Sequence, residues 1–173
     1  MAAAPARIRI YGSPVLRRRA RLADPGDPAT QDRLDAMWRV LRDDGGVGLA
    51  APQIGSDLRL VVVRDPGRPP GRQRLDLINP QVTATYGPAE PFEEGCLSFP
   101  GLFLTIHRPR GAAFRYQTAA GETRRLRDDG LVARIVQHEV DHLDGVLFID
   151  RLPPWRRWLV LPRLLWLRLR RGR

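Results

Sequence analysis

The chain has 173 residues, of which 43% are hydrophobic and 28% are charged. This length suits one domain with its own core, and the composition excludes a chain that is disordered throughout. All 29 basic residues are arginine, so Schiff-base chemistry by lysine is excluded as well. Eight of the arginines and no acidic residue lie in residues 151–173, so the net charge of +10 belongs mostly to this C-terminal tail.

The N-terminal segment and the single cysteine bear on cellular location. Residues 1–11 contain alternating arginine and isoleucine and lack the apolar stretch of a secretory signal. Cys96 has no second cysteine with which to form a disulfide, which suits a reducing compartment. We therefore expect a cytoplasmic protein.

The first regular element expected is a helix over residues 28–43. Asp27 is typical of an N-cap and Pro28 of the first helical position. Residues 48–53, which follow a pair of glycines, are too small and too interrupted by glycine and proline for a regular element, so we expect a loop with close backbone approach. The helix carries apolar residues at i, i+3, i+4 and i+7, namely Leu34, Met37, Trp38 and Leu41.

The middle of the chain predicts a series of short strands, because it is rich in β-branched residues and in alternating apolar positions. Ala119, Ala120 and Gly121 are typical of a hairpin turn between the last two of these strands. The expected strands cover residues 58–64, 75–79, 82–86, 103–106, 112–118 and 122–127.

A second helix is expected from an N-cap at Asp128 or Asp129 to about Leu143, with Gly145 just past its C-terminus. Most of its circumference is apolar, which is typical of a central helix packed on two sides. We therefore predict an α+β fold, in which short antiparallel strands surround this helix and the helix over residues 28–43 packs outside.

The second helix contains the motif His138-Glu139-x-x-His142. Four residues advance a helix by about 400°, so the two imidazoles stack on one face and can bind one metal ion. Glu139 is then a candidate to hold a metal-bound water without being a ligand. The alternative is two core histidines and a surface glutamate, but the chain has only three histidines and two of them have this spacing.

A catalytic metal of this kind needs a third protein ligand and one open position. Metzincins supply a third histidine downstream of the motif, where this chain has Phe148. The remaining candidates are Cys96, His107 and Asp150. Asp150 is too near the helix end to reach back easily, and His107 is interpreted as a surface or structural residue.

Cys96 lies in the sequence Glu-Gly-Cys-Leu-Ser over residues 94–98, and here the chain resembles the peptide deformylases. Two further motifs match that family in order and separation: Gly-Val-Gly-Leu-Ala-Ala-Pro-Gln over residues 46–53 and Gln-His-Glu-Val-Asp-His-Leu-Asp-Gly over residues 137–145. The resemblance covers about residues 8–150. It implies a peptide deformylase-like fold and a catalytic domain over residues 1–150, while the composition of residues 151–173 predicts a basic, helical extension.

The resemblance also implies a role for each residue of the site. Glu139 is the general acid and base. A thiolate and two imidazoles leave one position for water, whose pKa a metal can lower from about 15.7 to about 7. Metal-bound hydroxide then attacks the formyl carbon, while the backbone N–H of Leu97 and the side-chain amide of Gln53 stabilise the oxyanion. The implied metal ligands are Cys96, His138 and His142.

Residues that bind the substrate are expected beside these motifs. Gly48 lacks a side chain, which would let an extended peptide run beside the loop and bind through main-chain hydrogen bonds. Leu131 and Ile135 precede the metal-binding pair on the same helical face and are expected to line the methionine pocket. Phe103 stands where many family members have arginine, which concerns side-chain selectivity. The other expected substrate contacts are Val47, Glu94 and Gly95.

The reaction that the resemblance implies is removal of the formyl group from the N-terminal formyl-methionine of nascent polypeptides, with release of formate. The cofactor is one divalent metal ion per chain, iron(II) in cells, while zinc, nickel or cobalt also suit the site in purified protein. A metallopeptidase is one alternative, but it would need a histidine or glutamate in place of Cys96. Another is a catalytically weak deformylase-like module that binds the ribosome or a membrane, against which the intact Glu139 argues.

The tail from Pro153 to Arg173 mixes tryptophan, leucine and arginine and is loosely amphipathic as a helix, with Pro162 inside it. A helix docked on the domain with solvated arginines is one interpretation. The resemblance to bacterial deformylases with a ribosome-docking C-terminal helix implies ribosomal RNA as a partner, ranked ahead of a membrane surface, and no DNA partner is expected. One side gathers Trp155, Trp158, Leu159, Leu165, Trp166 and Leu169, while Val160, Leu164 and Leu167 interrupt the arginine side.

Overall fold

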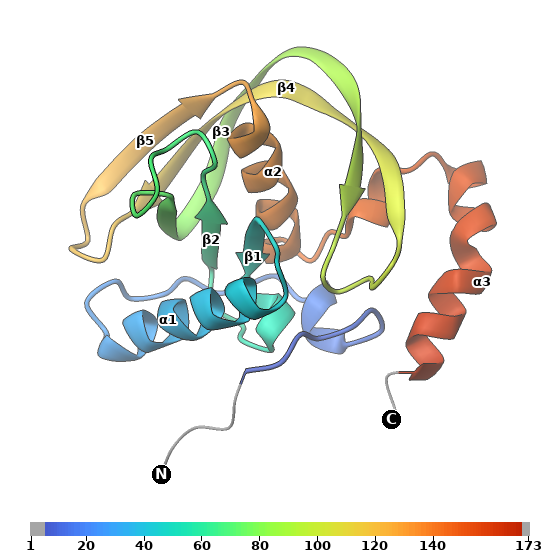
Figure 1. Ribbon diagram of the computed structural model, residues 1–173, viewed down its shortest axis with the longest axis horizontal. Coiled ribbons are helices and arrows are strands. Elements are labelled where there is room, and N and C mark those ends of the chain that lie inside the picture. The colour runs from blue at the N-terminus through green and yellow to red at the C-terminus, as the bar shows by residue number, and fades with distance from the viewer. Residues whose placement is uncertain (1–5, 171–173) are drawn as a thin grey trace.

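A computed structural model describes residues 6–170 (Figure 1). Expectations for residues 1–5 and 171–173 lie outside this range. The predicted α+β fold is confirmed, and none of the described helices is long and apolar enough to cross a membrane. In chain order the elements are a 3₁₀ helix Pro14–Arg17, α1 Pro28–Asp43, β1 Gly48–Ala50, a 3₁₀ helix Ala51–Ile54, β2 Leu60–Arg64, β3 Arg74–Gly95, β4 Phe103–Gln117, β5 Thr123–Asp128, α2 Leu131–Leu143, a 3₁₀ helix Phe148–Arg151 and α3 Pro154–Arg170.

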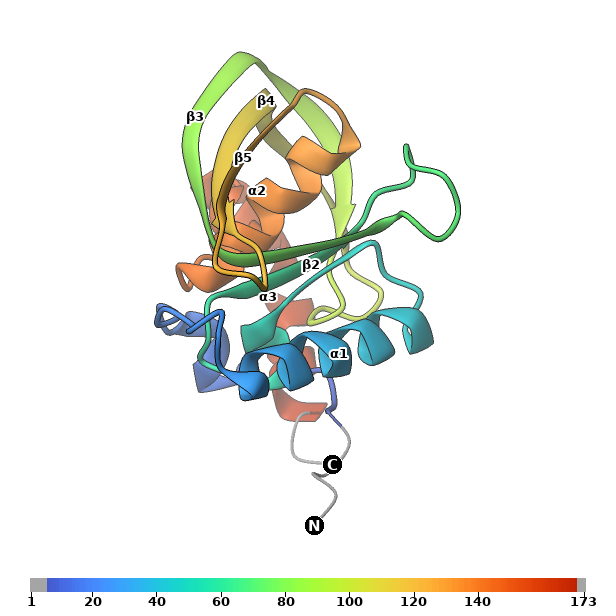
Figure 2. The same cartoon turned by 90° about the vertical axis from the view of Figure 1, so that its left-hand side faces the viewer.

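The five strands form one sheet in the order β1-β2-β3-β4-β5, and every neighbouring pair is antiparallel. β3 and β4 arch over α2, so that the sheet wraps around this helix (Figure 1, Figure 2). α1 packs against β1 and β2 on the side away from α2. α2 is therefore the central helix, as its mostly apolar circumference predicted.

Two strands are much longer than the sequence predicted. β3 joins the expected strands at residues 75–79 and 82–86 and continues to Gly95. β4 likewise joins the expected strands at residues 103–106 and 112–118 into one. The length of these two strands lets them arch over α2 and bring the segment after Gly95 beneath it.

Bulges explain why the sequence suggested strand ends inside β3. The pairing of β3 with β4 shifts register at three places, one of which spans Pro80 and another Gly87 and Pro88. A bulge accommodates residues that cannot join the regular ladder, and it bends a strand without ending it. Proline and glycine at these positions therefore mark bends in one strand and not the ends of two.

The prediction of a loop at residues 48–53 was wrong in part, because these residues form β1 and most of a 3₁₀ helix. β1 pairs with β2 from Gly48 opposite Val63 to Ala50 opposite Val61. The side-chain Oε1 of Gln53 accepts a hydrogen bond from the N–H of Ala50 (2.8 Å), which closes the turn between strand and helix. A strand of three residues is too short to produce a recognisable period in the sequence.

Both predicted helices of the catalytic region are confirmed. α1 has the predicted bounds, and the Asp27 carboxylate accepts a hydrogen bond from the N–H of Ala29 (2.9 Å). α2 ends where predicted, but its N-cap residue is Gly130 and not an aspartate. Asp128 still accepts hydrogen bonds from the N–H groups of Gly130 (2.9 Å) and Ala133 (2.7 Å), so it satisfies the first turn of α2 from outside the helix.

Three hydrophobic clusters hold these elements together. The first lies between α2 and the arched sheet, and the second lies between α1 and the pair β1 and β2. The third joins the turn after Cys96, the 3₁₀ helix Phe148–Arg151 and one side of α3, including Leu164 and Leu167. α2 therefore lies between rigid layers, and α3 is docked on the same body.

Candidate active site

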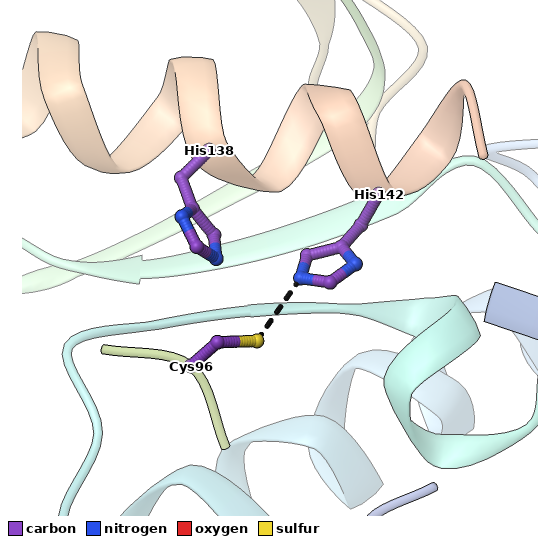
Figure 3. A group of neighbouring side chains, drawn as sticks. All are labelled: Cys96, His138 and His142. Carbon is purple, nitrogen blue, oxygen red and sulfur yellow. Dashed lines mark hydrogen bonds between the residues drawn. The ribbon is translucent and has the colours of Figure 1, made fainter. Parts of the chain in front are cut away.

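Three side chains from two distant segments converge beneath α2 (Figure 3). His138 and His142 project from α2 with their ring centroids 5.1 Å apart, and Cys96 follows the last residue of β3. The Cys96 sulfur lies 3.3 Å from Nε2 of His142. One potential ligand atom from each of the three residues lies within 4.8 Å of the other two. The arrangement gives one sulfur and two nitrogens a common focus.

The electrostatics of this focus favour a cation. Burial lowers the pKa of His138, but hydrogen bonds to Cys96 and Glu94 outweigh burial and raise the pKa to about 10. The surroundings of this ring therefore favour positive charge, and a metal ion would bind it by displacing the proton on Nε2. Burial and the charge of His138 lower the pKa of His142, which keeps that imidazole neutral, as a metal ligand must be. A thiolate with two imidazoles is a donor set that fits one metal ion in tetrahedral geometry with a fourth position open.

A buried ion network holds His138 in position. Glu94 accepts a hydrogen bond from Nδ1 of His138 (2.9 Å) and two from Arg108 (2.8 and 3.1 Å). Arg134 lies 2.9 Å from Glu94, and Asp141 lies 2.7 Å from Arg108. Burial raises the pKa of Glu94, but the bonds from His138 and Arg108 lower it to about 2. The ionised carboxylate therefore fixes the histidine tautomer that leaves Nε2 available for a metal.

Glu139 is buried on α2, next to His138. Its side-chain Oε2 has no hydrogen-bond partner among the described residues. Burial raises the pKa of Glu139 to about 7, although the charges of His138 and Arg108 oppose the shift. A carboxyl group that titrates near neutrality and keeps an oxygen free suits proton transfer.

Gly48 allows Glu139 and Ile135 to approach the backbone of β1. A Cβ atom at Gly48 would lie 2.7 Å from Oε1 of Glu139 and 2.5 Å from Cγ2 of Ile135. Packing against α2 therefore requires a glycine here. This reason differs from the substrate contact that the sequence suggested, and the two are compatible.

Gln53 directs its amide toward the same focus. Its Nε2 lies 3.5 Å from the Cys96 sulfur and 3.4 Å from Oγ of Ser98, while Ala50 fixes its Oε1. The amide N–H groups are thus oriented toward Cys96 and Ser98 by a fixed turn. Leu97, the residue after Cys96, lines the same space.

A cavity of about 610 Å³ opens beside these groups. Ile135 is buried in its wall, and Leu131 and Phe103 are exposed at it. His142 is the one predicted site residue that does not line it. The predicted residues that do are Val47, Gly48, Gln53, Glu94, Gly95, Cys96, Leu97, Phe103, Leu131, Ile135, His138 and Glu139.

The remaining candidates from the sequence lie elsewhere. His107 is exposed on β4, and Asp150 forms an ion pair with Arg17, so neither belongs to the group around Cys96. Arg108 and Arg134 are partners of the site that the sequence did not indicate. Neither lies in a motif that would set it apart from the other arginines, and only the fold shows that β4 carries Arg108 to the buried carboxylate of Glu94.

Two imidazoles one helical turn apart, a third donor from another segment and a buried glutamate beside a cavity define a metal-dependent hydrolase. Comparison with known proteins identifies the family. The family model of polypeptide deformylase matches residues 5–158. The chain belongs to this family.

Individual relatives cover nearly the whole chain. A peptide deformylase from Thermotoga neapolitana is 42% identical over 92% of this chain and 94% of its own length. Among solved structures, a plant peptide deformylase matches with a TM-score of 0.88 and 35% identity, covering 96% of this chain and 91% of that one. A peptide deformylase from Legionella pneumophila gives 0.86 and 33%, covering 98% and 99%. As a family member, the protein is a metal-dependent hydrolase that removes the formyl group from N-terminal formyl-methionine.

Proposed function

We propose that this chain removes the formyl group at the site formed by Cys96, His138 and His142, with Glu139 as the general acid and base. One observation carries this assignment: a sulfur and two imidazole nitrogens converge within 4.8 Å beside a cavity lined by Glu139. A metallopeptidase of this helix type would need a histidine or glutamate as the third donor, and the third donor at this focus is the sulfur of Cys96.

The position of each polar group supports one step of the reaction. Glu139, with its pKa near 7, accepts a proton from the attacking water and delivers it to the leaving amine. The Gln53 amide, oriented by Ala50, donates a hydrogen bond to the formyl oxygen as negative charge develops there, and the backbone N–H of Leu97 is the second donor. The C–N bond of the formamide then breaks, and formate and a free α-amine leave.

Cys96, His138 and His142 would hold one divalent metal ion, which when bound polarises the formyl group and lowers the pKa of water. We propose iron(II) in cells. Zinc, nickel and cobalt also accept a thiolate with two imidazoles. Metal analysis of protein purified without oxygen, beside protein purified in air, tests this. Iron in the first preparation supports the proposal, and zinc in both contradicts it.

The substrate methionine is proposed to bind against Leu131, Ile135 and Phe103. The support is that all three apolar side chains line the cavity. Phe103 packs over Gly95, where a Cβ atom would lie 2.6 Å from the ring, so a glycine is needed for Phe103 to occupy this place. The other proposed substrate contacts line the same cavity and are Val47, Gly48, Glu94 and Gly95.

Formate release tests the reaction. The metal-loaded protein should release formate from formyl-Met-Ala-Ser and leave acetyl-Met-Ala-Ser unchanged. Glu139→Gln is the matched control, because it keeps the size of the side chain and removes the carboxylate. Cleavage of internal peptide bonds by the wild type would support a metallopeptidase instead, and the absence of formate from fully loaded protein would support a binding module without turnover.

Location and domain division stay predictions. We propose residues 1–150 as the catalytic domain and 151–173 as a basic extension, which is supported by a family match that ends at residue 158. A cytoplasmic location is supported by the lone cysteine. Nascent formylated polypeptides are the proposed substrates.

Ribosome binding through the extension also stays a prediction, and its support is the number of arginines. Two of these arginines already bind the body of the protein. Arg157 donates to the carbonyl oxygen of Ile149 (3.1 Å), and Arg163 donates to the carbonyl oxygen of Gly101. These two guanidinium groups are therefore engaged by the body, which weakens the case for ribosomal RNA as a partner.

A further inference from the structure

α3 turns an apolar face away from the molecule. Leu164 and Leu167 are 4% and 2% exposed and belong to the third hydrophobic cluster, whereas Trp158 and Leu169 are 73% and 80% exposed. Figure 1 shows α3 along one edge of the molecule, with only one of its sides toward the body. We name the exposed set on the other side the outer face, which consists of Trp155, Trp158, Leu159, Leu165, Trp166 and Leu169.

The outer face is continuous and bordered by positive charge. At 100° per residue its six residues occupy about one third of the helix circumference, and no charged residue falls among them. Arg156 and Arg163 lie along one border, and Arg157 and Arg168 lie along the other beyond Leu161. Residues 151–173 contain no acidic residue at all.

These features match the chemistry of an anionic lipid surface. A helix in the plane of a membrane places its apolar side at the boundary between headgroups and acyl chains, with tryptophan enriched there and arginine along the polar border. Arginine side chains extend from the border to lipid phosphates, and each positive charge strengthens binding to an anionic surface. A helix that binds RNA would instead need its cations on the outermost side, where α3 carries tryptophan and leucine.

We propose that α3 is an in-plane anchor that binds the enzyme to an anionic membrane surface through its outer face, with Arg156 and Arg168 on lipid phosphates. The anchor is connected to the active site, because Arg163 donates to the carbonyl oxygen of Gly101, and Gly101 lines the cavity. An enzyme bound in this way meets its formylated substrates close to the membrane surface.

Intrinsic fluorescence gives a direct test, because three of the four tryptophans lie on the outer face and the fourth, Trp38, is buried in α1. The full chain is mixed with vesicles of equal parts phosphatidylglycerol and phosphatidylcholine, and with vesicles of phosphatidylcholine alone. We expect a blue shift and co-sedimentation with the anionic vesicles, both weakened by salt.

The matched variant carries Trp158→Ser, Leu159→Ser and Leu169→Ser. These side chains do not line the cavity, so formate release from a soluble formyl-peptide should be unchanged and serves as the control for folding. Partitioning into anionic vesicles should fall at least about tenfold. Equal partitioning of variant and wild type overturns the proposal.

The experiments also distinguish two other partners of the outer face, ribosomal RNA and a second copy of the chain. Binding to purified ribosomes that persists in the serine variant but weakens in Arg168→Gln, without binding to vesicles, would overturn the proposal in favour of RNA. A concentration-dependent dimer in sedimentation velocity that the serine variant abolishes, again without binding to vesicles, would overturn it in favour of a second copy of the chain.

Discussion

α2 and α3, the last two α-helices in the described part of the chain, distribute their side chains in opposite ways. α2 carries two histidines, Glu139 and Asp141 into the interior, although it is surrounded by the hydrophobic cluster beneath the sheet. α3 carries three tryptophans on the exposed side of the protein. The cause is what covers each helix, because β3 and β4 arch over α2 whereas α3 meets the body with one side only.

This contrast shows where function lies in the molecule. A buried charge is costly unless it is paired, so the charges on α2 indicate groups retained for chemistry. A continuous apolar face on the surface costs solubility, so the outer face of α3 indicates a binding partner. Neither helix follows the common pattern of apolar residues inside and polar residues outside, and each exception marks a proposed site.

The largest effect should come from substitution of Cys96, the proposed metal donor that lies outside α2. Cys96→Ala leaves two imidazoles and removes the thiolate, so metal content should fall from about one ion per chain to near zero, and formate release should fall to background. Metal analysis together with the formate assay measures both. Full metal content in this variant would show that α2 binds the ion without the sulfur.

The second effect separates the proposed metal ligands on α2 from Glu139, the proposed proton carrier. Glu139→Gln should keep its metal and lose about 10²- to 10⁴-fold in kcat, because general acid and base catalysis is removed while the ligands remain. Metal analysis and kcat for formyl-Met-Ala-Ser, measured on the same sample, check this. A variant that retained wild-type kcat would exclude Glu139 from proton transfer.

The third effect concerns the stability of the charged interior. Arg108→Met leaves Glu94 and Asp141 without their shared partner, so the free energy of unfolding should fall by about 3–5 kcal/mol. Arg168→Met, on the exposed part of α3, is the matched control and should change it by less than about 0.5 kcal/mol. Urea unfolding of both variants makes the comparison, and equal losses would contradict it.

The smallest effect tests the two sides of α3 with residues two positions apart. Leu167→Ala removes a buried side chain and should cost about 2 kcal/mol, at the lower end of the usual range because the end of a helix can undock locally. Leu169→Ala removes an exposed side chain and should leave stability nearly unchanged. Thermal unfolding distinguishes the two, and a larger loss from Leu169→Ala would mean that the outer face is buried.

The features predicted from the sequence are those encoded by local spacing. The bounds of α1 follow from its N-cap and apolar period, and the histidine pair follows from a separation of four residues on one helix. The full length of β3 was not predicted, because bulges absorb its proline and glycine residues. Arg108 was missed because its role depends on β4 crossing α2, which no local pattern encodes.

The tail shows the same limit. A helical wheel separates the outer face from Leu164 and Leu167, but both sides are apolar, and the sequence does not say which one docks. The structure decides this through the third cluster, where Phe99, Phe148 and Leu152 offer a surface to Leu164 and Leu167. Long-range packing, and not helix periodicity, therefore determines which residues stay exposed.

The presence of a single sulfhydryl has a practical consequence for this enzyme. Cys96 is the only thiol of the chain, it is partly accessible, and it is also a proposed metal donor. A bound ion shields the sulfur from alkylation, so an intact-mass spectrum after brief iodoacetamide treatment would show two populations, alkylated and protected. Their ratio gives the fraction of molecules in a preparation that carry the ion. Dividing the measured activity by this fraction gives the specific rate of the holoenzyme.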